Sequence, residues 1–154
     1  MTIRALFIAA AAFALPFGAH AAPVELKSEI FVERTEVSDS GETELVLAPA
    51  DRVVPGDKLR FVISFVNASD EEAANFVITN PVPGSIAYLS ADGPVTPEVS
   101  VDGEQFGALG DLTVAGADGS VRPAETADVT HVRWAFDAIA PNSEGEVRYL
   151  GELK

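Results

Sequence analysis

The sequence contains no cysteine, and only two of its 154 residues are histidine. The absence of cysteine excludes a disulfide framework, a lipid anchor on an N-terminal cysteine and zinc sites built on thiolates. Basic residues are also scarce, with 10 Lys and Arg against 24 Asp and Glu and a net charge of −14. Because nucleic acids and anionic membranes are bound through clustered Lys and Arg, we expect neither as a partner.

The first residues have the pattern of a secretory signal peptide. Arg4 precedes an apolar run, Ala5–Phe17, and the small-x-small tripeptide Ala19–Ala21 follows. This pattern predicts cleavage before Ala22, and the run is shorter than the roughly 20 residues of a membrane-spanning helix. We therefore expect residues 1–21 to be removed on export to the periplasm or cell surface, with no membrane insertion. Export without any cysteine favours a bacterial protein.

Residues 22–154 have the length of one domain, and their apolar pattern is that of strands. The clearest alternation is Leu59–Phe65, in which every second residue is large and apolar and which follows a Pro-Gly-Asp turn. No helical periodicity competes with it, so we expect an all-β fold. About seven short strands between Pro and Gly turns favour an immunoglobulin-like Greek-key β-sandwich. Further strands are predicted at Val24–Val32, Leu45–Leu47, Ala74–Ile78, Ile86–Leu89, Glu98–Val101, Gln105–Leu109, His131–Phe136 and Glu146–Leu150.

The order of several turn and strand motifs resembles an immunoglobulin-like repeat domain of bacterial surface and secreted proteins, the domain of unknown function eleven. The motifs are Val54–Asp57, Phe65–Asn67, Ala74–Gly84 and Val132–Trp134 before Ala140-Pro141. The resemblance covers about residues 50–152 and implies a sandwich fold and no catalytic residues. Asn80 departs from it, because the family usually has Asp there. Family members occur as tandem arrays, whereas this chain holds a single copy behind the leader.

The candidate sites for chemistry are few. His20 falls in the predicted leader, so His131 is the remaining imidazole, and no G-x-S-x-G elbow accompanies it. We expect His131 to be exposed and assign no catalytic residue and no cofactor. Calcium is an alternative, because acidic turn residues supply oxygen ligands, although no EF-hand spacing is present. The residues concerned are Asp70, Glu71, Glu72, Asp102, Glu104, Asp111 and Asp118.

Aromatic residues and one sequon complete the candidates. Phe61, Phe65, Phe76 and Trp134 are interpreted as core residues from their strand positions, not as a sugar-stacking platform. Asn67-Ala68-Ser69 matches a glycosylation sequon, but we expect the Asn67 amide to brace a turn.

The sequence thus predicts a non-enzymatic, exported structural or protein-binding module. A partner protein is expected at an edge strand, Val24–Val32, or at an acidic surface. The alternatives are a calcium-dependent or carbohydrate-binding module and, less favoured, a hydrolase. The oligomeric state stays open.

Overall fold

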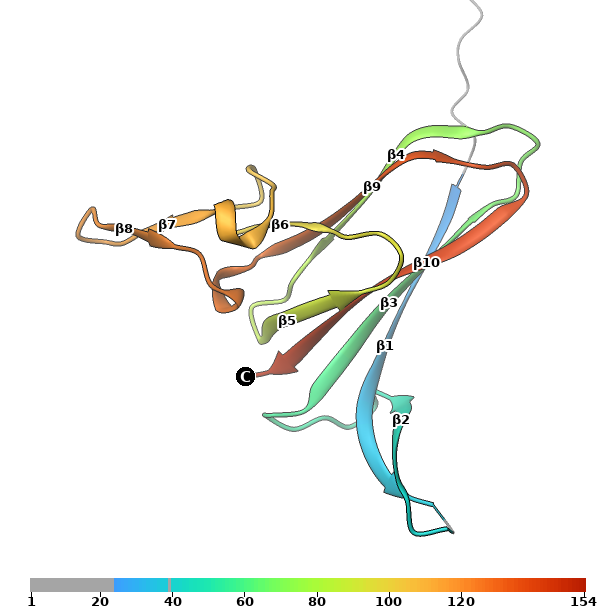
Figure 1. Ribbon diagram of the computed structural model, residues 1–154, viewed down its shortest axis with the longest axis horizontal. Helices are drawn as coiled ribbons and strands as arrows, with labels where there is room; N and C mark the ends of the chain where they lie inside the picture. Colours follow the sequence, from blue (N-terminus) through green and yellow to red (C-terminus); the bar gives the residue numbers. More distant parts are fainter. Residues whose placement is uncertain (1–23, 39) are drawn as a thin grey trace, which may run out of the picture.

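The computed structural model describes residues 24–38 and 40–154, and this part of the chain is all-β (Figure 1). The predicted leader, residues 1–21, lies outside the described residues. Among the described residues no helix is long and apolar enough to cross a membrane. The elements are β1 Val24–Val37, β2 Thr43–Pro49, β3 Lys58–Asn67, β4 Ala73–Pro81, β5 Ile86–Asp92, β6 Glu98–Ser100, the 3-10 helix η1 Leu109–Asp111, β7 Thr113–Ala115, β8 Val121–Pro123, the 3-10 helix η2 Thr126–Asp128, β9 His131–Ile139 and β10 Ser143–Leu153.

The strands form antiparallel sheets. Five strands lie in the order β2-β1-β3-β10-β5, three in the order β4-β9-β6, and β7 pairs with β8 alone. The two larger sheets share one core: the rings of Phe65 in β3 and Phe136 in β9 meet edge to face at 5.1 Å. Trp134 of β9 lies 6.4 Å from Tyr149 of β10 between ring centroids. The predicted all-β class is confirmed, and the arrangement is consistent with a β-sandwich.

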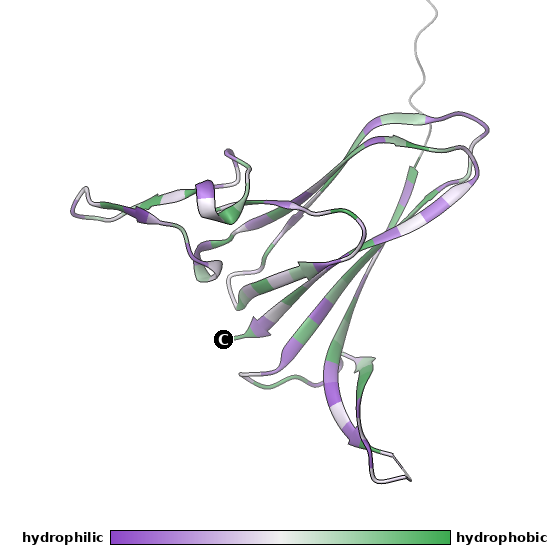
Figure 2. Ribbon diagram, in the orientation of Figure 1, coloured by the Kyte–Doolittle hydropathy of each residue, from purple (hydrophilic) through white to green (hydrophobic). Residues whose placement is uncertain are grey.

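Strand β3 is the centre of the five-stranded sheet. Its inward side chains, Leu59 to Phe65 at every second position, are each at most 7% exposed. Val62, on the opposite face, is also buried, so the prediction of an interior strand is correct. Figure 2 shows the alternation of apolar and polar residues along this strand. β10 carries glycine where these rings approach it, because a Cβ at Gly145 would collide with the Phe65 ring.

The turn before β3 explains why the Pro-Gly-Asp motif is there. Gly56 has a φ of 92°, which glycine adopts without strain, and the Asp57 N–H donates to the Val54 carbonyl at 3.0 Å. The Asp57 carboxylate accepts from the Val54 N–H and from Arg34 of β1. The hydrogen bond from Arg34, followed by that from Val54, lowers the pKa of Asp57. The turn is thereby fixed to β1.

Three sequence predictions need correction. β1 extends to Val37 and forms the expected hairpin with β2, but β2, not β1, is the outermost strand along Phe31–Val37. The segment Gln105–Leu109 is not a strand: it makes one bridge and then enters η1. The reason is local, since the Asp102 carboxylate takes the N–H groups of Glu104 and Gln105. The ten described strands also exceed the predicted number of about seven, and β7 and β8 were not predicted because strands of three residues are too short to show alternation.

Candidate interaction site

The inner face of β1 is left partly uncovered. Val32, Ile30 and Leu26 lie opposite Leu59, Phe61 and Phe65 of β3, so they point toward the three-stranded sheet. Val32 is 2% exposed, but Ile30 is 46% and Leu26 is 52% exposed. The apolar alternation predicted the strand correctly, yet the described residues leave about half of the surface of Leu26 and Ile30 exposed.

A cleft of about 200 Å³ adjoins this uncovered face. Its walls come from Ser28–Ile30 of β1 and from Asn80 and Pro81 at the end of β4, and β3 contributes Phe61 and Ile63. Of the described residues that line it, Glu29 alone carries a charge. Among the described residues, the two strands beside the cleft have free backbone edges there: β4 pairs with β9 alone, and β2 pairs with β1 from Phe31 onward. Unpaired strand edges are surfaces on which another strand can add. The cleft therefore combines apolar side chains with free backbone groups.

The acidic turn Asp70–Glu72 lies where β1 and β4 begin, at the opposite end of β4 from the cleft residues Asn80 and Pro81. Val24 pairs with Asn67, the last residue of β3, and Ala73 follows the turn directly. Glu71 and Glu72 are exposed, and Asp70 accepts a hydrogen bond from the Asn142 amide at 3.0 Å. These carboxylates place negative charge where the edge strand β4 begins.

Asn67 fixes the shape of that turn. Its side chain is fully buried, and its amide donates to the carbonyls of Glu71, Ile139 and Ala140. Its Oδ1 accepts from the N–H and hydroxyl of Ser69. The prediction that Asn67 braces a turn is confirmed. Burial of the amide in five hydrogen bonds leaves none of it free to carry a glycan.

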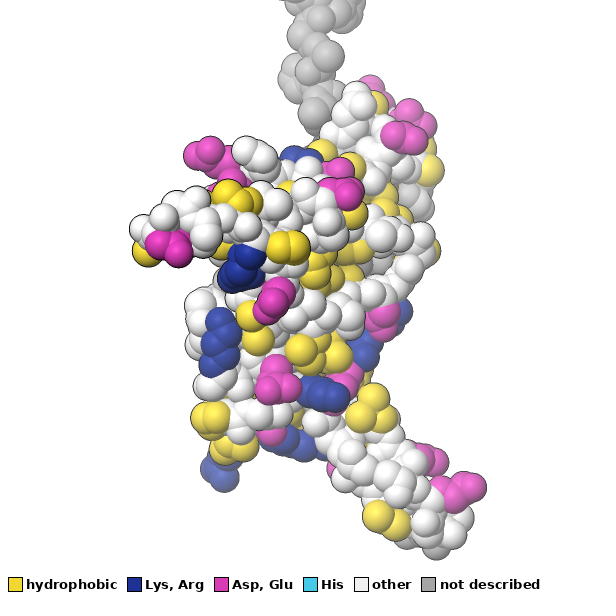
Figure 3. All heavy atoms as spheres, turned by 60° about the vertical axis from the view of Figure 1, so that its left-hand side comes forward, with side chains coloured by type: hydrophobic (Ala, Val, Ile, Leu, Met, Phe, Trp, Pro, Cys, Tyr) yellow, Lys and Arg dark blue, Asp and Glu magenta, His cyan; other side chains and the backbone are white. Residues whose placement is uncertain are grey.

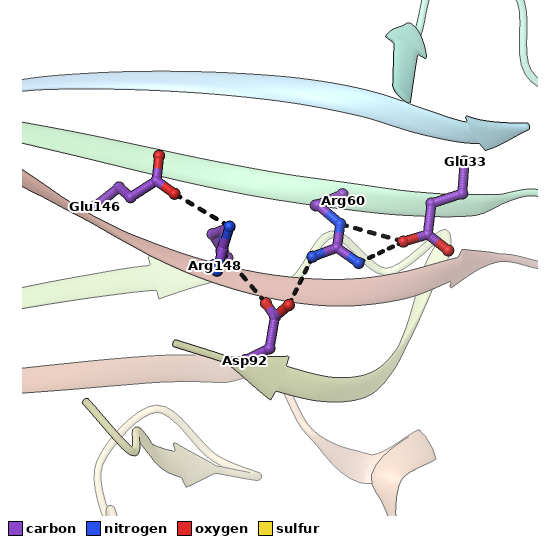
Figure 4. Close-up of polar contacts among 5 residues, drawn as sticks. All are labelled: Glu33, Arg60, Asp92, Glu146 and Arg148. Atoms are coloured by element: carbon purple, nitrogen blue, oxygen red, sulfur yellow. Dashed lines mark hydrogen bonds and ion pairs between the residues drawn. The ribbon is translucent and has the colours of Figure 1, made fainter. Parts of the chain in front are cut away.

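An ionic network crosses the outer face of the five-stranded sheet (Figure 4). Arg60 of β3 contacts Glu33 of β1 at 2.6 Å and Asp92 of β5 at 2.7 Å. Asp92 also pairs with Arg148 of β10, which contacts Glu146. The hydrogen bond to Glu33 is the main cause that raises the pKa of Arg60. These groups satisfy one another across four strands, so the network is structural and offers no unpaired charge for chemistry.

His131 is half-buried, not exposed as expected. Its Nδ1 lies 3.0 Å from the Thr130 hydroxyl, and its ring packs edge to face with Phe106. A Cβ at Gly103 would come within 2.9 Å of the imidazole, so a glycine there makes room for the ring. No acidic side chain is hydrogen-bonded to His131 among the contacts of residues 24–38 and 40–154. The arrangement is that of a packed surface residue.

The carboxylates considered for calcium do not come together. Within the described chain no three His, Asp or Glu side chains are placed to hold one metal ion. Asp102 caps a loop by accepting from Gln105, Glu104 and Ser100, and these hydrogen bonds lower the pKa of Asp102. Asp118 does the same with Ser120. These two side chains are therefore occupied with turn formation.

The aromatic residues belong to the core, as predicted. Trp134 and Tyr149 are fully buried, and Phe61 stacks parallel to Tyr149 at 4.4 Å. The Tyr149 hydroxyl accepts from the Asn80 amide, and burial raises the pKa of Tyr149 to about 12. The Trp134 indole N–H has no hydrogen-bond partner in the described structure. None of these rings forms an exposed stacking platform.

Comparisons of the chain with protein-family models, with curated proteins and with solved structures found no match. The candidate site therefore rests on the geometry of this chain. Sequence reasoning missed the cleft, because the alternation of β1 says that Leu26 and Ile30 share a face but not what lies over that face.

Proposed function

We propose that the chain is a non-enzymatic, exported module that binds another protein through the open side of its sandwich. The observation that carries the proposal is the exposure of Leu26 and Ile30 on an inward-facing strand surface beside free strand edges. Exposed inward-facing apolar residues beside an open edge are typical of a strand-addition site. The proposal includes an immunoglobulin-like Greek-key topology, which the resemblance implies, and a single domain over residues 22–154, which the length predicts.

Export to the bacterial periplasm or cell surface is part of the same proposal. It is supported by the leader pattern of residues 1–21 and by the absence of cysteine. The scarcity of Lys and Arg supports a protein partner over a nucleic acid or a membrane surface. A basic region on that partner would be attracted by the net charge of −14.

A role without catalysis is supported by the surroundings of His131. The ring is held by Thr130, Phe106 and the space at Gly103, and a triad needs instead a carboxylate on one ring nitrogen and a nucleophile on the other. His131 is proposed to pack the loop that precedes β9.

Affinity capture from an envelope extract tests this function. We expect the immobilised domain to retain a protein that salt releases, because charge attraction is screened over about 8 Å at physiological ionic strength. His131→Ala should capture the same protein equally well. The proposal is contradicted if no protein is retained while a hydrolytic activity copurifies with the domain and His131→Ala abolishes it.

A further inference from the structure

The three-stranded sheet stops one strand short on the side of β1. β4 is its last strand, and Asn80 and Pro81 of β4 line the cleft together with Phe61 and Ile63 of β3. The next position outward in the same sheet, about 4.8 Å beyond β4, lies over β1. β1 stands in the same relation to β3 in the facing sheet, and its Leu26 and Ile30 are the side chains left exposed. One added strand would therefore pair with the edge of β4 and cover Leu26 and Ile30 of β1.

We propose that an extended segment of a partner protein occupies this position as a fourth strand of the three-stranded sheet. It pairs with the free edge of β4, a strand of nine residues, and places alternate apolar side chains against Leu26 and Ile30. Main-chain hydrogen bonds to an open edge supply affinity, and the side chains on the inner face supply selectivity. The inference rests on the proposed function and names the ligand class for that site.

The acidic residues near the start of β4 determine which charge the partner segment carries at one of its ends. β4 begins directly after Glu71 and Glu72, which are exposed and lie at the opposite end of β4 from the cleft residues Asn80 and Pro81. The nearby cation on β1, Lys27, contacts Glu29 at 3.1 Å, which offsets its charge. A partner strand that extends past Ala73 thus meets uncompensated carboxylates, and the segment carries Lys or Arg at that end.

Charge also disfavours a second copy of this chain as the occupant of this position. Each copy carries a net charge of −14, so a second copy would bring a like-charged surface against the exposed carboxylates Glu71 and Glu72. Like charges placed side by side disfavour such pairing. The occupant is therefore another protein with a basic end to its strand.

Synthetic peptides test the assignment directly. The probe is a nine-residue peptide of alternating valine and threonine that ends in two lysines, because a strand antiparallel to β4 ends where β4 begins. It is titrated into the isotope-labelled domain and followed by NMR. One control peptide has the same composition with its valines consecutive, and another has glutamates in place of the lysines. We expect shifts of amide signals in β4 and in Val24–Ile30 with the probe, and roughly tenfold weaker binding for each control.

Matched variants locate the binding. Leu26→Ser with Ile30→Ser should weaken binding of the probe roughly tenfold, whereas Val121→Ser, which also removes an exposed apolar side chain, should leave it unchanged. Glu71→Lys with Glu72→Lys should remove the preference for lysine over glutamate. Glu36→Lys with Glu44→Lys changes the net charge equally on the β1–β2 hairpin and should keep that preference.

Each other outcome overturns the inference. It fails if the probe does not bind, if signals shift elsewhere, or if the domain is a dimer that Ile30→Ser dissociates, because the occupant is then a second copy. The outcomes for the proposed function differ: an envelope protein that wild type captures and Leu26→Ser with Ile30→Ser does not, without any binding of the probe, supports that function and refutes this ligand class. Probe binding without any captured protein supports the site chemistry and refutes the function.

Discussion

The two open sides of the sandwich differ in what covers them. On the side of β5 and β6, the chain from residue 101 to 130 folds back: η2 contacts β5, and Val129 is 5% exposed. Leu109 and Leu112 also pack against the core from this segment. On the side of β1 and β4, Leu26 and Ile30 lie uncovered on the inner face. One side is covered by its own chain, and the other has no cover from the described residues.

The difference shows that the burial of an inward-facing apolar side chain depends here on whether another segment lies over it, and not on the sheet that carries it. Both sides present apolar residues on the inner face, but the outer edge of β6 is bridged by Gly107 of the covering segment, whereas among the described residues no strand pairs with the outer edge of β4. The covering segment is held by backbone hydrogen bonds from Thr130 to Ser100 and from Ala124 to Leu112. Arg122 adds a two-point ion pair with Asp128 at 2.7 Å. Figure 3 shows this side, with acidic and basic side chains interspersed among apolar ones.

The largest effect is expected in the core that both sides share. Phe61→Ala removes a ring that is 7% exposed and stacked on Tyr149, and it should lower the free energy of unfolding by about 3–5 kcal/mol. Phe106→Ala, a half-buried ring outside this core, should cost less than half as much. Urea unfolding followed by Trp134 emission, which should be blue-shifted in the fold, measures both. Equal losses would contradict the placement of the core.

An intermediate effect separates the two sides. Val129→Ala on the covered side should lower the free energy of unfolding by about 1–3 kcal/mol, because it empties buried volume. Ile30→Ser on the open side should change it by less than about 1 kcal/mol, because the side chain is 46% exposed. Thermal and urea unfolding of the two variants test this. A larger loss for Ile30→Ser would mean that the open side is covered within this chain.

The smallest effect is expected from acid on the covering segment. The hydrogen bond from Arg122 is the first cause that lowers the pKa of Asp128 to about 2, from a usual 3.8. A carboxyl with a lowered pKa in the fold stabilises it above pH 3.8, and that stabilisation is lost as the pH falls toward 2. Asp102 and Asp118, in the same segment, shift in the same direction.

Hydrogen exchange measured at pH 5 and near pH 3 tests whether acid weakens the covering segment first. We expect residues 101–130 to lose protection, after correction for intrinsic exchange rates, before β3 and β10 do. Asp128→Asn should reproduce part of the loss at pH 5, since it removes the charge that pairs with Arg122. Simultaneous loss across all strands would contradict a separately weakened segment.

Strands with strong alternation were predictable from sequence, and short or capped segments were not. Leu59–Phe65 and Val132–Phe136 alternate because their side chains meet one core, and both are strands. Gln105–Leu109 failed because the Asp102 side chain takes the backbone donors that a ladder needs. The bracing role of Asn67 was predictable from turn chemistry, but its contact with Ile139, 72 residues away, was not.

The sequence by itself determined the all-β class, the residues of β3 and β9 that face the core, and the acidic surface. These properties follow from local periodicity and composition. Only the tertiary structure decided that Val32 is covered and that Leu26 and Ile30, on the same face, are not. The physical reason is that the position of a residue along a strand specifies the face toward which its side chain points. Its burial depends on how many strands the facing sheet has. That number is set by long-range pairing, which here leaves β4 as the last strand beside the cleft.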